Sequence, residues 1–198
     1  MAAMASVGVP LMFGQSAAPT EHGHTTRALP QRLARRAYRH MPAWAREASY
    51  RSLRLVALLY RRTVLRNTTF IGVTGSGGKT TTKDLIALAL EPLGCTKSPE
   101  GWNNKGGVAW STLLARPHRR FHVQEVAIGQ SSFPIEDSLP VLSSKVAVVT
   151  AIGTDHVKLY GSIEGIAEEK GKLVATLPPD GTAIWPGKHT AAAETAVE

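Results

Sequence analysis

Cysteine and long apolar runs are scarce in this sequence. Cys95 is the single cysteine among 198 residues. One thiol excludes an internal disulfide framework and a zinc site built from several cysteines, so we expect a reducing, cytoplasmic environment. No apolar run approaches the ~20 residues that a transmembrane helix requires. Residues 1–18 lack the positively charged start of a secretory signal, so we do not expect export.

Acidic side chains are almost missing from the first third of the chain. Residues 1–65 contain ten arginines and two glutamates, whereas residues 66–198 contain 13 basic and 13 acidic side chains. The net charge of +8 therefore belongs to the N-terminal third alone. No recognised nucleic-acid-binding module accompanies this charge, so nucleic acid is the least favoured partner for it.

The N-terminal third divides into two segments. Residues 1–29 mix small and polar residues without a period, which predicts a disordered leader. Residues 30–66 are rich in arginine, and Pro42 divides them into predicted helices at 30–40 and 43–64. In the second helix, apolar residues recur at helical spacing between arginines, which indicates a basic amphipathic helix. These apolar residues are Leu53, Val56, Leu59, Tyr60 and Val64.

Two interpretations of the basic helical segment 30–66 stay open. The helix can pack against its own domain and leave its arginines in water. Alternatively, it can dock on an anionic membrane surface, which would place the chain peripherally at the inner membrane.

The stretch Phe70–Leu90, FIGVTGSGGKTTTKDLIALAL, organises the rest of the chain. It predicts a strand, a turn with three glycines and a helix over about 79–91. Backbone N–H groups in such a turn, together with the helix N-terminus, bind polyphosphate. Lys79 would reach the β- and γ-phosphates, and Thr80 would bind Mg²⁺. The expected ATP-binding residues are Thr74, Gly75, Ser76, Gly77, Gly78, Lys79, Thr80 and Thr81.

The remaining pattern predicts an α/β fold with a mostly parallel sheet and flanking helices. Strands are expected at Phe121–Ile128, Lys145–Ile152 and Thr182–Trp185, and Gly94–Pro99 is expected to be a short connection. Helices are expected within Gly101–Ala115, over Phe133–Leu142 with Pro134 in its first turn, and over Ser162–Leu177 with Ser162 as N-cap.

Glu125 lies near the carboxyl end of its predicted strand. Ligands of open parallel sheets bind at this edge, and a carboxylate there can hold the Mg²⁺ of a nucleotide. An ion-paired or solvated glutamate is the alternative. Asn103 and Asn104 would by themselves be interpreted as a turn.

Five separated motifs resemble the Mur ligases, the ATP-dependent amide-forming enzymes of cell-wall precursor assembly. They are the loop T-G-x-x-G-K-T, the N-N segment, E-V-A-I-G, the strand end G-T-D-H, and the helix with Lys170 followed by P-P-D-G-T-A. The pattern is most similar to the branch that adds D-alanyl-D-alanine. It departs at Ala109 and Ala151, where the family usually has proline and asparagine, and Val73 stands where a general phosphate loop has glycine.

The resemblance implies a P-loop-like central domain of a ligase that works through an acyl phosphate. It also implies that Thr80, Glu125, His156 and Lys170 organise Mg²⁺ and that Lys170 is carbamylated. Lys79, His156 and Lys170 would be the catalytic residues, and a wall-precursor carboxylate and an amino acid or dipeptide would be the substrates. An ordinary solvated lysine is the alternative for Lys170.

We expect residues 67–198 to form an incomplete central ATP-binding domain. The family's substrate domain does not fit into the first 65 residues, and its C-terminal domain has no counterpart. The chain as given is therefore expected to be inactive alone, as a truncated product or as half of a split enzyme with a partner chain. The competing interpretations are a nucleotide-binding regulatory module anchored at the membrane and a plain ATPase or kinase.

Overall fold

A computed structural model describes residues 42–127, 135–153 and 157–185. The helices and strands of these described residues belong to one compact unit, Ala43–Glu198. The predicted leader 1–29 and the predicted helix at 30–40 lie outside the described residues.

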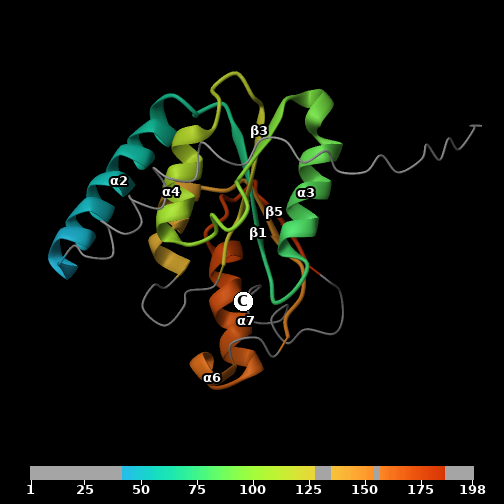
Figure 1. The fold of residues 1–198 in the computed structure, drawn as a ribbon. Coiled ribbons are helices and arrows are strands. Elements are labelled where there is room, and N and C mark those ends of the chain that lie inside the picture. Colours follow the sequence, from blue (N-terminus) through green and yellow to red (C-terminus); the bar gives the residue numbers. More distant parts are fainter. Residues whose placement is uncertain (1–41, 128–134, 154–156, 186–198) are drawn as a thin grey trace, which may run out of the picture. The chain divides into compact units, whose positions relative to one another are not determined.

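Parallel strands form the centre of this unit (Figure 1). They are β1 Thr69–Thr74, β2 Cys95–Lys97, β3 Phe121–Glu125, β4 Val146–Val149 and β5 Thr182–Ile184, arranged in the order β2-β3-β1-β4-β5. Every strand pair is parallel, so the predicted α/β fold is confirmed. Because β1 lies between β3 and β4, the loop after β1 is flanked by the carboxyl ends of both neighbours.

Strand β2 was not predicted, because Cys95–Lys97 lies in the segment expected to be a short connection. The strand has three residues and lies between Gly94 and Pro99, so the segment has no apolar alternation long enough to indicate a strand. It pairs only with β3 in the described sheet and forms its edge.

Helices cover both faces of the sheet. Helix α3 (Lys79–Ala89) packs through Ile86 and Ala87 on one face, against the valines and isoleucine of β1, β3 and β4. Phe70 and Ala147 point to the other face and pack with α5 and α7. The helices on that side are α4 Lys105–Leu114, α5 Leu139–Leu142 and α7 Ile163–Ala175, with the short α6 Val157–Tyr160 before α7.

The single helix predicted over Phe133–Leu142 is wrong. Residues 133 and 134 lie outside the described part, and the rest forms a 3₁₀ turn, η2 (Ile135–Asp137), followed by α5. Pro140 accounts for the break, because proline has no N–H to donate to the carbonyl four residues earlier. A second 3₁₀ turn, η1 (Glu91–Leu93), follows α3.

The predicted helix at 43–64 is confirmed as α2, Ala43–Thr63. One side of α2 packs on α4 and α5 through residues such as Leu53 and Ala57. The expectation that its arginines all face water is corrected, because Arg54 donates to the Asp137 carbonyl and Arg61 donates to the Leu65 and Ser143 carbonyls. These arginines bind carbonyls at the ends of neighbouring elements. Within the described residues, no helix is long and apolar enough to cross a bilayer.

His122 is a buried polar side chain in the centre of β3. Its ring nitrogens lie 2.9 Å from Thr96 Oγ1 and 3.2 Å from Ser111 Oγ. Burial lowers the pKa of His122 from its usual 6.5 to about 4. Between these values the unfolded chain binds more protons than the folded chain, so the free energy of unfolding decreases as the pH falls.

We therefore expect acidification from pH 6.5 to 5.5 to lower the free energy of unfolding by about 1 kcal/mol through His122. Urea unfolding at both pH values measures this, and His122→Gln should reduce the difference. His118→Gln, at an exposed position, is the control and should leave the difference between the two pH values as it is in wild type. Equal pH dependence in wild type and His122→Gln would contradict this role.

Candidate functional site

The glycine-rich loop after β1 has a backbone that side chains could not adopt. Gly75 has φ 146°, and a Cβ on it would lie 2.0 Å from Thr150 Oγ1. Gly78 has φ 74° and is the N-cap of α3, with no side chain capping the helix. The first N–H groups of α3 therefore remain available to an anion, as in phosphate-binding loops.

Backbone and hydroxyl contacts hold the loop to the end of β4. Ser76 N donates to the Ala151 carbonyl over 2.8 Å, and Gly153 N donates to Ser76 Oγ over 2.8 Å. Thr150 Oγ1 donates to the Gly77 carbonyl over 2.5 Å. The chain between β4 and residue 153 therefore forms one wall of the loop.

Lys79 and Thr80 begin α3 at the mouth of the loop. Lys79 Nζ donates to the Gly75 carbonyl over 2.7 Å, so the ammonium group lies back over its own loop. Thr80 Oγ1 donates to Glu125 Oε2 over 2.8 Å. Thr81, which was also predicted to bind nucleotide, is exposed in the first turn of α3.

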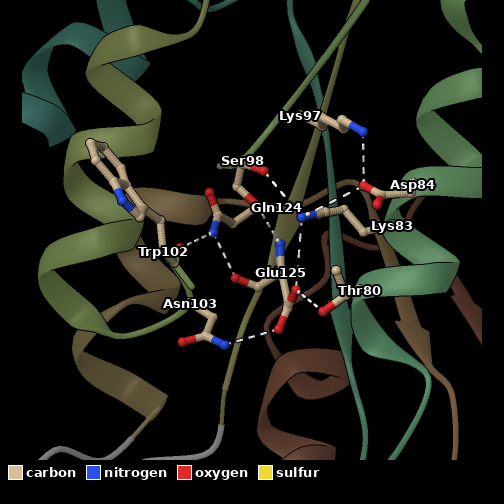
Figure 2. A network of polar contacts seen from close by, with 9 residues as sticks. All are labelled: Thr80, Lys83, Asp84, Lys97, Ser98, Trp102, Asn103, Gln124 and Glu125. Carbon is tan, nitrogen blue, oxygen red and sulfur yellow. Dashed lines mark hydrogen bonds and ion pairs between the residues drawn. The ribbon is translucent and has the colours of Figure 1, made fainter. Parts of the chain in front are cut away.

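Glu125 is the centre of a polar network at the end of β3, which Figure 2 shows. Its carboxylate is almost fully buried and also accepts a hydrogen bond from Asn103 Nδ2 over 2.9 Å. Lys83 Nζ lies 3.8 Å from Glu125 Oε2. The ion-paired alternative for Glu125 is thus present in the structure, and the same carboxylate also faces the loop through Thr80.

Lys83 was missed by the sequence analysis. Its side chain is 2% exposed, and its ammonium donates to the Ser98 carbonyl over 3.2 Å. A signal was available, because a residue four positions after Lys79 and three after Thr80 lies on the same side of a helix. Lysine within an apolar helix pattern is ordinarily interpreted as a solvated residue.

The two asparagines have separate roles. Asn104 is the N-cap of α4 and accepts from Gly107 N over 2.9 Å, which agrees with a simple turn interpretation. Asn103 binds Glu125 instead, and its carbonyl accepts from Ala127 N. Gln124 joins the same segment to β3 by donating to the Trp102 carbonyl over 2.8 Å (Figure 2).

Of the two remaining predicted site residues, the structure describes Lys170 but not His156. Lys170 is 1% exposed within α7, so it is not an ordinary solvated lysine. Helix α7 starts at the carboxyl edge of the sheet, because it connects β4 to the parallel strand β5. Its neighbour Glu169 accepts from Ile135 N and pairs with Lys172. His156 lies outside the described residues, so its convergence with Glu125 and Lys170 stays a prediction.

The donor set at Glu125 suits a hard cation that is bound together with phosphate. Among the described residues, no group of three His, Cys, Asp or Glu side chains could hold a metal ion. Mg²⁺ usually keeps several waters and takes one or two carboxylates plus substrate phosphates. The Thr80 hydroxyl and the Glu125 carboxylate therefore fit Mg²⁺ that arrives with a nucleotide.

A cleft of about 770 Å³ lies away from this site. It is lined by Arg61, Arg66 and Lys145 and by residues at the starts of β1 and β4, which are at the amino edge of the sheet. None of the predicted nucleotide-binding residues lines this cleft. The candidate site is therefore identified from the geometry of the glycine-rich loop and not from the cleft.

Comparison with known proteins gives a consistent picture. The family model of the Mur ligase middle domain matches residues 73–197. A UDP-N-acetylmuramoyl-tripeptide--D-alanyl-D-alanine ligase of Synechocystis is 39% identical over 130 residues, which are 64% of this chain and 28% of that protein. The enzyme of that name from Bacillus subtilis is 38% identical over 125 residues, which are 61% of this chain and 26% of that protein.

Solved structures agree with these relatives. MurF from Acinetobacter baumannii has a TM-score of 0.67 and 28% identity, and the match covers 74% of this chain and 33% of that one. MurF from Thermotoga maritima, determined in complex with ADP, has a TM-score of 0.66 and 26% identity over 75% of this chain and 34% of that one. The chain therefore spans about a third or less of the length of these relatives.

Proposed function

The chain belongs to the Mur ligase family, and from this premise we propose that it is the ATP-binding part of a ligase that joins an acid to an amine during cell-wall precursor synthesis. Residues 67–198 would be the central ATP-binding domain. The observation that carries the proposal is the Thr80 hydroxyl facing the Glu125 carboxylate over 2.8 Å beside an uncapped, glycine-rich helix N-terminus.

In this proposal the loop binds the phosphates of ATP. The N–H groups around Gly77 and Gly78 and the N-terminus of α3 donate to phosphate oxygens. Lys79 leaves the Gly75 carbonyl and stabilises negative charge on the γ-phosphate. Because Ser76 and Thr150 already fix the loop to the end of β4, little backbone ordering is needed when the nucleotide binds.

Thr80 and Glu125 would hold the magnesium ion of the nucleotide. Bound Mg²⁺ neutralises phosphate charge and makes the γ-phosphate a better electrophile. Asn103 and Lys83 keep the Glu125 carboxylate at the mouth of the loop. His156 and Lys170 are proposed to complete this environment, with Lys170 as a carbamylation candidate because its side chain is buried.

The reaction proposed for the whole enzyme follows from the names of the relatives. A carboxylate of a UDP-N-acetylmuramoyl-tripeptide would attack the γ-phosphorus of ATP, forming an acyl phosphate and releasing ADP. The amine of D-alanyl-D-alanine would then displace phosphate and form the amide. These substrates are inferred from the relatives, and the described residues supply the phosphate and metal part of the site.

The proposal can be tested by measuring ATP affinity calorimetrically with Mg²⁺ and with a chelator. Glu125→Gln should remove most of the gain that Mg²⁺ gives, at least about ten-fold in affinity, because a neutral amide is a poor ligand for a hard cation. Binding of metal-free ATP should change little, because Glu125 does not face the phosphates directly in this scheme.

Exposed Glu100→Gln is the matched control and should behave as wild type. If Glu125→Gln keeps the full magnesium gain, Glu125 is not a metal ligand. If wild type does not bind ATP under either condition, the nucleotide-binding assignment itself is wrong.

A further inference from the structure

Helix α2 forms an outer layer on the helices that cover one face of the sheet. It packs on α4 and α5 through one side, and Figure 1 shows it beyond α4 as seen from the strands. The opposite side of α2 exposes large apolar residues to solvent. Trp44 is 75% exposed, Leu55 57%, and Val56 and Leu59 54% each.

Helical spacing places the apolar residues of this outer side in one stripe. Leu55 and Leu59 are four residues apart, Val56 adjoins them, and Trp44 lies three turns before Leu55 on the same side. On the neighbouring α4, Trp110 and Leu114 are also four residues apart and exposed. Monomeric proteins rarely expose apolar side chains in such an ordered group without a binding role.

The charge on the two helices around this stripe is mostly positive. Residues 43–63 and 105–120 contain nine lysines and arginines and a single acid, Glu47. Glu47 is paired with Arg51 over 3.1 Å and with Lys105 over 3.6 Å. Arg62 and Arg116 are exposed, and Arg54 and Arg61 are turned inward to carbonyls. The outer side of α2 therefore combines an apolar stripe with a cationic rim.

We propose that the outer side of α2 binds the surface of an anionic lipid bilayer. The helix would lie in the plane of the interface, with the stripe of Leu55, Val56 and Leu59 among the upper acyl chains. Arg51 and Arg62 flank that stripe, and their long side chains can reach lipid phosphates while their stems stay apolar. This inference does not depend on the proposed ligase function.

The excess of cations favours a lipid surface over a second copy of the chain. A second copy would bring the same arginine-rich side into contact with itself, and like charges would repel. An anionic bilayer attracts every exposed cation at once, which compensates for an apolar stripe only a few residues wide.

The experiment uses the full chain and flotation with vesicles of phosphatidylglycerol and phosphatidylcholine, compared with phosphatidylcholine alone. We expect binding to the anionic vesicles and its reversal by salt. Leu55→Asp/Leu59→Asp should weaken that binding by about ten-fold or more. The matched control is Leu85→Asp/Leu88→Asp on α3, where the leucines are 61% and 65% exposed.

Both double variants change the net charge equally, so only a specific role of α2 separates them. Thermal unfolding must show that each variant remains folded. The proposal is overturned if wild type does not bind anionic vesicles, if it binds neutral vesicles equally well, or if both double variants lose the same amount of binding. Wild-type binding that is unaffected by Leu55→Asp/Leu59→Asp would also overturn it, and would assign the binding to other basic residues of the chain.

Discussion

Replacing Lys79 by alanine should weaken ATP binding by about 100-fold, which corresponds to about 3 kcal/mol. Lys79 is a basic residue at the mouth of the loop, and its Nζ donates to the Gly75 carbonyl over 2.7 Å. Exchanging that neutral acceptor for phosphate oxygens pairs the ammonium with groups of opposite charge, which strengthens the interaction. Calorimetric titration with ATP and Mg²⁺ measures the loss.

The same variant should leave folding nearly intact. The Lys79 side chain is partly exposed and its contact is with a carbonyl of its own loop, so the free energy of unfolding should change by less than about 1 kcal/mol. Lys97→Ala is the control, because Lys97 is half exposed and pairs with Asp84 away from the loop. A loss of affinity no larger in Lys79→Ala than in Lys97→Ala would show that Lys79 does not bind phosphate.

Local signals in the sequence were sufficient for most of the fold. The apolar run within Lys145–Ile152 and the apolar, β-branched residues after Phe70 predicted strands, and these strands, β4 and β1, both lie inside the sheet. Ser162 was expected to cap α7, and its hydroxyl accepts from Gly165 N over 3.1 Å. In these cases a propensity within a few residues agrees with the tertiary environment.

The errors arise where distant residues decide the structure. Strand β2 forms because it pairs with the edge of β3. The three residues between Gly94 and Pro99 contain no local pattern that predicts this pairing. In the segment before β4, Pro140 breaks the helix, and distant residues then hold the 3₁₀ turn, because the Asp137 carbonyl accepts hydrogen bonds from Tyr50 and Arg54 of α2. Sequence spacing within the segment cannot reveal such partners.

The candidate site shows the same division. Thr80 and Glu125 could be predicted because each occupies a recognisable position, after a phosphate loop and at a strand end. Asn103 could not, and only helical spacing from Lys79 and Thr80 pointed to Lys83. The roles of both residues depend on the approach of α3 and the residue-103 turn to β3. The sequence therefore indicated the proposed ligand-binding groups, and the structure adds the residues that contact them.

Lys83→Met should lower the free energy of unfolding by about 3 kcal/mol, although it removes no group from the predicted ligand set. The substitution keeps a long, unbranched side chain but leaves the buried Glu125 carboxylate without its nearest ammonium, which lies 3.8 Å away in wild type. Hydrogen bonds from Thr80 and Asn103 remain, so we expect destabilisation and not complete unfolding. Urea unfolding measures the change.

Two comparisons separate the charge of Lys83 from its packing. Lys97→Met removes an exposed lysine that also pairs with Asp84, and it should cost less than about 0.5 kcal/mol. Adding Glu125→Gln to Lys83→Met should recover part of the loss, because the uncompensated charge is then gone, with a coupling of about 1–3 kcal/mol. If the two substitutions are additive, Lys83 acts through its contacts with Ser98 and Asp84 and not through Glu125. If instead they couple, the buried ammonium of Lys83 on α3 holds the Glu125 carboxylate in place beside the glycine-rich loop.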